Sequence, residues 1–172
     1  AIIGAARNDS GIMGVAFNST LLALRTDSPG SCGASGCSHF DSDLARAMDV
    51  AVANAARVVN VSRGGSPPSS TFINAVGRAA DAGVIVVISA GNDGNPNPND
   101  FALVANNAAA KNMVIIAGSH AVDGTSLSSF SNAAGTGQTH YLVALGECVR
   151  TINENGDAVI GSGTSFAAPQ IS

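Results

Sequence analysis

The sequence has no tryptophan, a single tyrosine and few charged residues, which make up 12% of its 172 positions. Aromatic side chains therefore contribute little to burial, and the core has to come from alanine, valine, isoleucine and leucine, within the 45% of residues that are hydrophobic. Small aliphatic residues suit strands that are buried on both faces, as in parallel sheets. The length fits one domain with a sizeable core.

Positive charge is also scarce, with eight Lys and Arg against twelve Asp and Glu and a net charge of −4. The basic residues are scattered, so the sequence has no cluster of positive charge that would indicate binding to nucleic acid or to an anionic membrane. No apolar run approaches the roughly 20 residues of a bilayer span, and the longest, 84–90, has the length of a strand. The chain opens without Met or a basic n-region, so we expect any signal peptide to have been removed or to lie upstream.

Only three cysteines are present. Cys32 and Cys37 lie in the Gly-rich stretch SCGASGCS, which can bend them together, and a disulfide there would indicate an exported protein. The alternatives are free thiols or half of a metal site, for which Cys148 and His39 supply too few well-spaced ligands. Cys148 follows a strand-like pattern, and we expect it to be a small buried hydrophobe.

Alternating strand and helix patterns run along the chain. Four aliphatic runs between turn residues predict buried strands at 21–25, 57–62, 84–90 and 112–119. Helical spacing predicts helices over 41–56, with Asp41 or Ser42 as N-cap, and over 69–83, with Gly83 at the C′ position. This alternation predicts an α/β fold with three layers, a parallel sheet covered by helices on both faces.

Three later segments are also assigned from their turn chemistry. The stretch 91–100 is rich in Asn, Gly and Pro and predicts a loop at the carboxyl end of a strand, where open α/β sheets bind ligands. The stretch 149–160 predicts a hairpin that turns near Glu154-Asn155-Gly156. After it, GSGTSFAAPQIS leads into the start of a helix.

Ser165 stands at that helix start, where N–H groups and the helix dipole favour negative charge. Taken alone, GTS is more typical of a Ser or Thr that caps a helix than of a nucleophile. A dinucleotide fingerprint is disfavoured because the third glycine is missing. A nucleophile elbow is disfavoured because in that fold the acid and histidine follow the serine, and only seven residues follow here.

The combination of motifs is more specific than any one of them. GTSFAAP at 163–169 resembles the nucleophile motif of the subtilisin-like serine proteases, the subtilases, and SAGNDG at 89–94 resembles their oxyanion segment. NVSRGG at 60–65 resembles their substrate-binding strand, and GIMGVAF at 11–17 resembles the sequence after their histidine-bearing helix. The resemblance covers essentially the whole chain, and GTSFAAPQIS is most similar to bacterial members, including autotransporter passenger domains.

The resemblance implies a secreted or cell-surface serine endopeptidase that acts on protein or peptide substrates, and it allows for a propeptide. It implies that Ser165 is the nucleophile and that Asn92 donates to the oxyanion, aided by the Ser165 N–H. The substrate-binding residues that it implies are Ser62, Arg63 and Gly64, which offer a backbone edge, and Ala90 and Gly91, which wall the pocket before the scissile bond. Arg63 replaces the usual apolar residue, and we expect its side chain to point to solvent.

Neither the aspartate signature nor the histidine signature His-Gly-Thr-His-Val-Ala-Gly of the family occurs in the sequence. We expect residues 1–172 to be part of a peptidase domain that begins just after the histidine motif and ends inside the nucleophile's helix. His39, His120 and His140 lie outside any motif, and we expect them to be loop or surface residues. Without a base the serine stays protonated, so this chain is expected to be inactive alone.

Two further expectations follow from the resemblance. It implies no required cofactor, but 6–14 matches in length a loop that binds structural calcium in some subtilases, with Asn8 as a side-chain ligand; a simple turn is the alternative. The competing function is a non-catalytic, peptide-binding domain of the same family. We expect Ser165 and Asn92 to face one another across a cleft at the strand ends.

Overall fold

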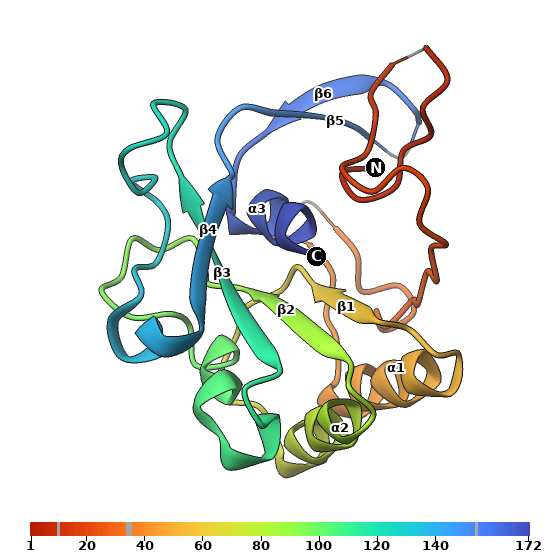
Figure 1. Ribbon diagram of the computed structural model, residues 1–172, viewed down its shortest axis with the longest axis vertical. Helices are drawn as coiled ribbons and strands as arrows, with labels where there is room; N and C mark the ends of the chain where they lie inside the picture. Colours follow the sequence, from red (N-terminus) through yellow and green to blue (C-terminus); the bar gives the residue numbers. More distant parts are fainter. Residues whose placement is uncertain (10, 34–35, 154) are drawn as a thin grey trace.

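The structure is a computed structural model that describes residues 1–9, 11–33, 36–153 and 155–172. Its centre is a four-stranded parallel sheet in the order β1-β2-β3-β4, shown in Figure 1. The strands are β1 (Val58–Val61), β2 (Ile85–Ser89), β3 (Val114–His120) and β4 (Tyr141–Leu145). The strands predicted from 57–62, 84–90 and 112–119 are thus confirmed, and each pairs in parallel with its neighbour.

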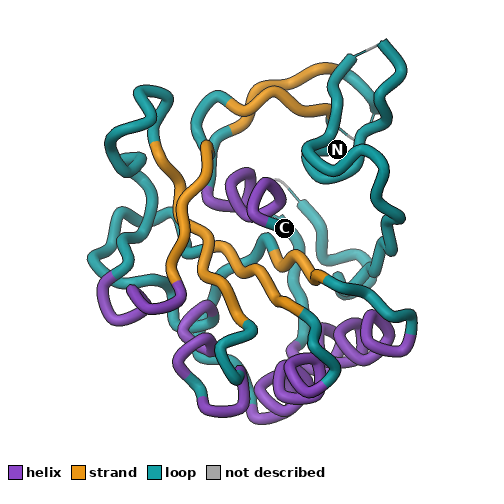
Figure 2. The backbone as a smooth tube through the Cα atoms, in the orientation of Figure 1, coloured by secondary structure: helices purple, strands orange, loops and turns teal. Residues whose placement is uncertain are grey.

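Helices cover both faces of this sheet. On one face lie α1 (Asp41–Ala53) and α2 (Ser70–Asp81), and on the other lies α3 (Thr164–Ile171), as Figures 1 and 2 show. Successive residues of β2 face opposite sides, so Val86 packs into the core under α1 and α2 while Val87 packs against α3. This arrangement confirms the predicted α/β fold.

The connections after β2 are longer and less regular. Two short 3₁₀ helices, η1 (Ala102–Asn106) and η2 (Ala108–Ala110), lead into β3, and η3 (Gly135–His140) leads into β4. The chain then forms an antiparallel hairpin of β5 (Val149–Ile152) and β6 (Ala158–Gly161), which confirms the predicted hairpin. Within its turn, Gly156 has a φ of 87°, and Glu154 lies outside the described residues.

The helix ends agree with the sequence pattern only in part. Gly83 has a φ of 75° just after α2, as predicted for a C′ glycine. The N-cap of α1 is Phe40 rather than Asp41 or Ser42, and no side chain caps the helix. The Asp41 carboxylate instead accepts a hydrogen bond from the N–H of Ser69, the residue that precedes α2. The α1 helix also ends at Ala53, because the chain turns into the left-handed region at Ala55.

The strand predicted at 21–25 is wrong. Among the described residues no strand pairs with this segment, and its Leu21 and Leu22 are 55% and 46% exposed. An aliphatic run becomes a strand only where a neighbour supplies hydrogen-bond partners. The strand β4 was not predicted, because it lies at the edge of the sheet, its Leu142 and Val143 are half exposed, and its pattern lacks a clear alternation.

None of the helices in the described part of the chain has the length and apolar character needed to cross a bilayer.

Candidate active site

Three segments far apart in the sequence meet where α3 begins. Ser62 follows the last residue of β1, the loop that starts at Ala90 follows β2, and Ser165 lies in the first turn of α3. The Ser62 hydroxyl donates a hydrogen bond of 3.0 Å to the main-chain oxygen of Ser165, and the Ser165 hydroxyl donates one of 3.4 Å to the main-chain oxygen of Ser62. The carboxyl ends of β1 and β2 thus hold the start of α3, at the edge where parallel sheets bind ligands.

Asn92 is fixed in orientation by the same helix. Its Oδ1 accepts hydrogen bonds from the main-chain N–H of Thr164, at 2.8 Å, and from the Thr164 hydroxyl, at 2.9 Å. Because two donors face this atom, it must be the oxygen, and the Nδ2 amino group points elsewhere. Within the described residues Nδ2 donates to no protein atom, and Asn92 is exposed. An oriented, unused donor therefore stands beside the turn that carries Ser165.

The N–H of Ser165 is a second unused donor. The first N–H groups of a helix have no carbonyl one turn back. In α3 the N–H of Thr164 bonds to Asn92 and that of Phe166 bonds to Gly163, whereas that of Ser165 has no partner among the described residues. The N-cap is Gly163, with a φ of 151° and no side-chain cap, so Ser165 is not a helix-capping serine.

Thr164 also holds the site together, a role that was not predicted from the sequence. Its side chain is fully buried, and its hydroxyl both donates to Asn92 and accepts a hydrogen bond of 3.3 Å from the N–H of Gly91. One threonine thus ties the loop after β2 to the first turn of α3. The only signal in the sequence was its place next to Ser165.

The other residues predicted to bind substrate lie around these three segments. Gly64 is exposed on the chain that leaves β1, an edge strand, and a Cβ there would meet the Asn99 side chain at 3.0 Å. Gly91 has a φ of 107° and is half-buried. Ala90 is fully buried and packs in the core under α1 and α2, so its side chain does not line the surface.

The expectation that Arg63 points to solvent is wrong. Its guanidinium carbon lies 5.1 Å from the centre of the Phe101 ring, and its Nη1 lies 3.8 Å from Oδ1 of Asp41. Its side chain is 27% exposed, because it folds back over the aromatic ring and the start of α1. Arg63 thereby links the segment that follows β1 to the body of the domain.

The three histidines take no part in this arrangement. His39 contacts the Thr26 hydroxyl through Nδ1, at 2.9 Å, and is half-buried. His120 is the last residue of β3 and His140 is the last of η3, so both lie in regular elements and not in loops, and both are partly exposed. In the described part of the chain, no hydrogen bond joins any of the three to Ser165.

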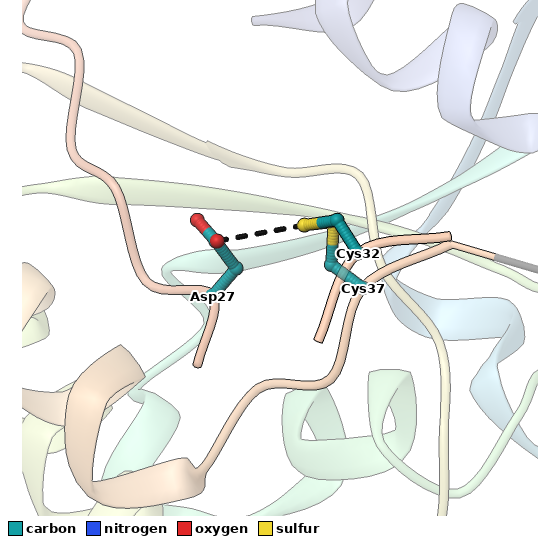
Figure 3. A group of neighbouring side chains, drawn as sticks. All are labelled: Asp27, Cys32 and Cys37. Atoms are coloured by element: carbon teal, nitrogen blue, oxygen red, sulfur yellow. Dashed lines mark hydrogen bonds between the residues drawn. A yellow bond between two sulfur atoms is a disulfide. The ribbon is translucent and has the colours of Figure 1, made fainter. Parts of the chain in front are cut away.

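The cysteines lie apart from the site. Cys32 and Cys37 are joined by a disulfide in the structure, and Cys148 is a free thiol. Oδ2 of Asp27 lies 3.5 Å from the Cys32 sulfur, the contact dashed in Figure 3. A disulfide sulfur carries no proton and is not a thiolate, so these three groups form neither a hydrogen bond nor a metal site.

Cys148 is not the buried hydrophobe that we expected. It is exposed, and its φ of 52° places it in a tight turn between β4 and the hairpin, where its N–H bonds to the Ser162 hydroxyl. The strand pattern around it breaks at this residue because β5 begins only at Val149.

Asn8 lies in the N-terminal segment, on a cavity of about 200 Å³ formed by its own loop. The lining residues are Ala6, Arg7, Asn8, Asp9, Gly11, Ile12 and Met13. The guanidinium of Arg7 is directed to the Phe17 ring, 5.8 Å away, and Asp9 has a φ of 59°. Oxygen donors from Asn8, Asp9 and the main chain suit a hard cation such as calcium.

Fold and geometry together define an α/β protein that presents a serine, two free donors and an exposed backbone edge at one point. The family model described as the Subtilase family matches residues 1–172, so the chain belongs to the subtilase family. It is 31% identical over 168 residues to the minor extracellular protease Epr of Bacillus subtilis (strain 168), covering 98% of this chain and 24% of that protein. It is 34% identical to the major intracellular serine protease of the same strain, covering 97% of this chain and 50% of that protein.

Solved structures agree with this assignment. The patellamide maturation protease PatA superposes with a TM-score of 0.79 and 26% identity, covering 98% of this chain and 58% of that one. The chain spans about a quarter of the length of Epr and half that of the intracellular protease.

Proposed function

We propose that this chain supplies the nucleophile and the oxyanion donors of a serine endopeptidase. The observation that carries the proposal is the orientation of Asn92, whose oxygen is held by Thr164 so that its amino group stays free beside Ser165. The free N–H of Ser165 is the second donor. Two fixed donors at one point are suited to a tetrahedral oxyanion, whose charge develops only during the reaction.

The reaction begins with attack of the Ser165 Oγ on a peptide carbonyl carbon. A bond forms between Oγ and carbon, the hydroxyl proton passes to a base, and the carbonyl oxygen becomes an oxyanion. Collapse breaks the carbon–nitrogen bond, the amine leaves with a proton, and water then hydrolyses the acyl-enzyme. The hydroxyl of Ser165 donates a hydrogen bond to the main-chain oxygen of Ser62, so a base has to replace this contact before the serine can attack.

The substrate binds as an added strand. Ser62 and Gly64 are exposed beyond the end of β1, an edge strand. The main-chain groups of Arg63 bond within the domain, to the oxygen of Val61 and to the Ser89 hydroxyl, whereas those of Gly64 have no partner among the described residues and can pair with an extended peptide. Arg63 holds this segment against Phe101 and Asp41. Because its positive charge already faces Asp41 and the Phe101 ring, Arg63 is not expected to favour acidic substrates at this position.

The test compares the 172-residue chain with the parent protein extended upstream through the aspartate and histidine motifs and freed of any propeptide. The short chain should be inert toward a peptide amide, and the long one should cleave it. In subtilisin, the type example, loss of the histidine costs about 10⁶ in turnover. A fluorophosphonate should label the long chain at Ser165 and leave its Ser165→Ala variant unlabelled.

A folded, propeptide-free long chain without activity would instead support the non-catalytic domain. That domain should bind an extended peptide, and Gly64→Pro should abolish binding because proline removes a main-chain donor.

We also propose that the loop 6–14 holds a structural calcium ion. Asn8, which lines the cavity, supplies a side-chain oxygen ligand, and neighbouring main-chain carbonyls supply others. Adding calcium should raise the melting temperature of the chain and should not do so in Asn8→Ala. An unchanged melting temperature in the unsubstituted chain would leave this loop as a simple turn.

Our third proposal is that the protein is exported to the cell surface or the medium, as is a passenger domain of a bacterial autotransporter. Relatives include both an extracellular and an intracellular protease, so the support comes from the disulfide. Alkylation of the protein from its natural host without reduction should modify Cys148 alone. Modification of all three cysteines would contradict export.

A further inference from the structure

We propose that Asn132 is a positioning residue that fixes the loop carrying Asn92, and this inference rests on the proposed function. Asn132 lies between β3 and β4 and is fully buried. It makes hydrogen bonds to the loop on both sides of Asn92 but none to Asn92 itself.

The side chain of Asn132 uses both ends of its amide. Oδ1 accepts hydrogen bonds of 3.0 Å from the main-chain N–H groups of Asp93 and Asn95. Nδ2 donates to the main-chain oxygen of Ala90, at 3.2 Å. The main-chain N–H of Asn132 donates to the oxygen of Gly91, at 3.0 Å. One residue therefore bonds to both residues before Asn92 and to two of the three after it.

Close packing makes this arrangement specific. A Cβ at Gly91 would lie 2.4 Å from Nδ2 of Asn132, and the φ of Gly91 is 107°, so only glycine fits between the two. A buried amide is costly unless its groups are paired, and here three hydrogen bonds satisfy it. The position thus favours an asparagine over an apolar residue or a charged one.

Asn132 is itself held by the body of the sheet. The Tyr141 hydroxyl, from β4, donates to its main-chain oxygen, and so does the Ser131 hydroxyl, at 3.1 Å. The N–H of Ser119, in β3, donates to the Ser131 hydroxyl at 3.0 Å. Through Asn132, the loop that carries Asn92 is therefore anchored to strands β3 and β4 of the sheet.

The consequence concerns turnover more than binding. Asn92 is exposed, and within the described residues its side chain bonds only to Thr164, so the direction of its free amino group also depends on the path of the backbone at 90–95. An oxyanion donor acts in the transition state, and a shift of its direction lowers kcat while leaving substrate contacts at β1 in place.

The first test uses the long, active chain and the variant Asn132→Ser, with Asn106→Ser as matched control. Asn106 also donates one side-chain bond to a main-chain oxygen, that of Thr136, but on the exposed surface. We expect kcat to fall about tenfold in Asn132→Ser with KM unchanged, less than the 10²–10³ known for direct loss of the oxyanion asparagine in subtilisin. Both variants must retain a cooperative thermal transition.

A double-mutant cycle tests whether Asn132 acts through Asn92. In an Asn92→Ala background, Asn132→Ser should lower kcat no further, because the donor it positions is gone. Full additivity would overturn the inference. An inactive long chain with all native residues would instead overturn the proposed function.

A third measurement needs no catalysis. In the 172-residue chain, the side-chain amide protons of Asn92 should change chemical shift and exchange faster in Asn132→Ser than in the unsubstituted chain or in Asn106→Ser. If the Asn92 amide is unaffected, Asn132 does not position it, whatever the activity of the long chain.

The variant Asn132→Asp adds a pH-dependent readout. Its carboxyl group can keep all three bonds when protonated, but when ionised it faces the oxygen of Ala90 with no donor. Burial raises the pKa of such a carboxyl. The ratio of its kcat to that of the native chain should therefore fall as pH rises, and a flat ratio below one would indicate a merely structural defect.

Discussion

The two faces of the parallel sheet differ in how they are covered. Under α1 and α2 lies a large core, in which the rings of Phe72 and Phe101 are in contact, tilted by 33° with 4.7 Å between their centres. On the opposite face a small cluster of Val87, Ala117 and Ala168 joins the sheet to α3. The first face supplies most of the buried apolar surface, whereas the second carries the serine and is joined to the strand ends largely by hydrogen bonds. The main hydrophobic core and the serine thus lie on opposite faces of one sheet.

The strongest test of this division is the variant Phe72→Ala. Phe72 is fully buried, and truncation should cost about 3–5 kcal/mol of unfolding free energy because a large cavity remains. Urea titration of the 172-residue chain measures the loss. The control is Phe40→Ala, which removes a ring that is 66% exposed and should change stability by less than about 0.5 kcal/mol. Equal losses would mean that the face under α1 and α2 is not the main core.

A matched pair in β2 separates the two faces more finely. Val86 and Val87 are both fully buried but face opposite sides. Each change to alanine should cost about 2 kcal/mol, from two lost methyl groups and a small cavity. Only Val87→Ala should slow fluorophosphonate labelling of Ser165 in the long chain, because it loosens the packing of α3. Slower labelling in Val86→Ala alone would reverse the assignment of the faces.

The disulfide in the N-terminal segment should have a smaller effect, and one confined to stability. Cys32 and Cys37 are five residues apart, and closing so short a loop stabilises a protein by about 2 kcal/mol in the chain-entropy account. Replacing both by serine should lower the urea midpoint by a corresponding amount and leave labelling of Ser165 in the long chain unchanged. A change in labelling would show that this loop supports the site.

The smallest expected effect is a pH dependence from Tyr141. Burial raises the pKa of its phenol, an effect that the Ser131 hydrogen bond partly offsets. Below about pH 10 the phenol is protonated in both states and its contribution is complete; above it the unfolded chain loses the proton first, so stability falls until the folded pKa is passed. Tyr141→Phe should remove this part of the alkaline decline. Identical pH profiles for the two proteins would contradict it.

The sequence predicted the sheet better than its surroundings. Runs such as 84–90 are aliphatic on both sides because both faces of β2 are covered, and that pattern is distinctive. The run at 21–25 has similar residues but does not form a strand in the described structure. Whether a partner strand lies beside a run cannot be predicted from the residues of the run itself. For the site, motif letters pointed to Ser165 and Asn92, whereas Asn132 gives no local signal because its role depends on contacts with a loop some forty residues earlier, from Asp93 at a separation of 39.

The contacts between Ser62 and Ser165 join residues that are 103 positions apart. Contacts at such separation form late in folding, since the cost of closing the loop must be met after the local helices and neighbouring strands are in place. During synthesis the serine also leaves the ribosome after every strand of the sheet. A nascent or half-folded chain therefore carries no assembled pair of donors at the start of α3.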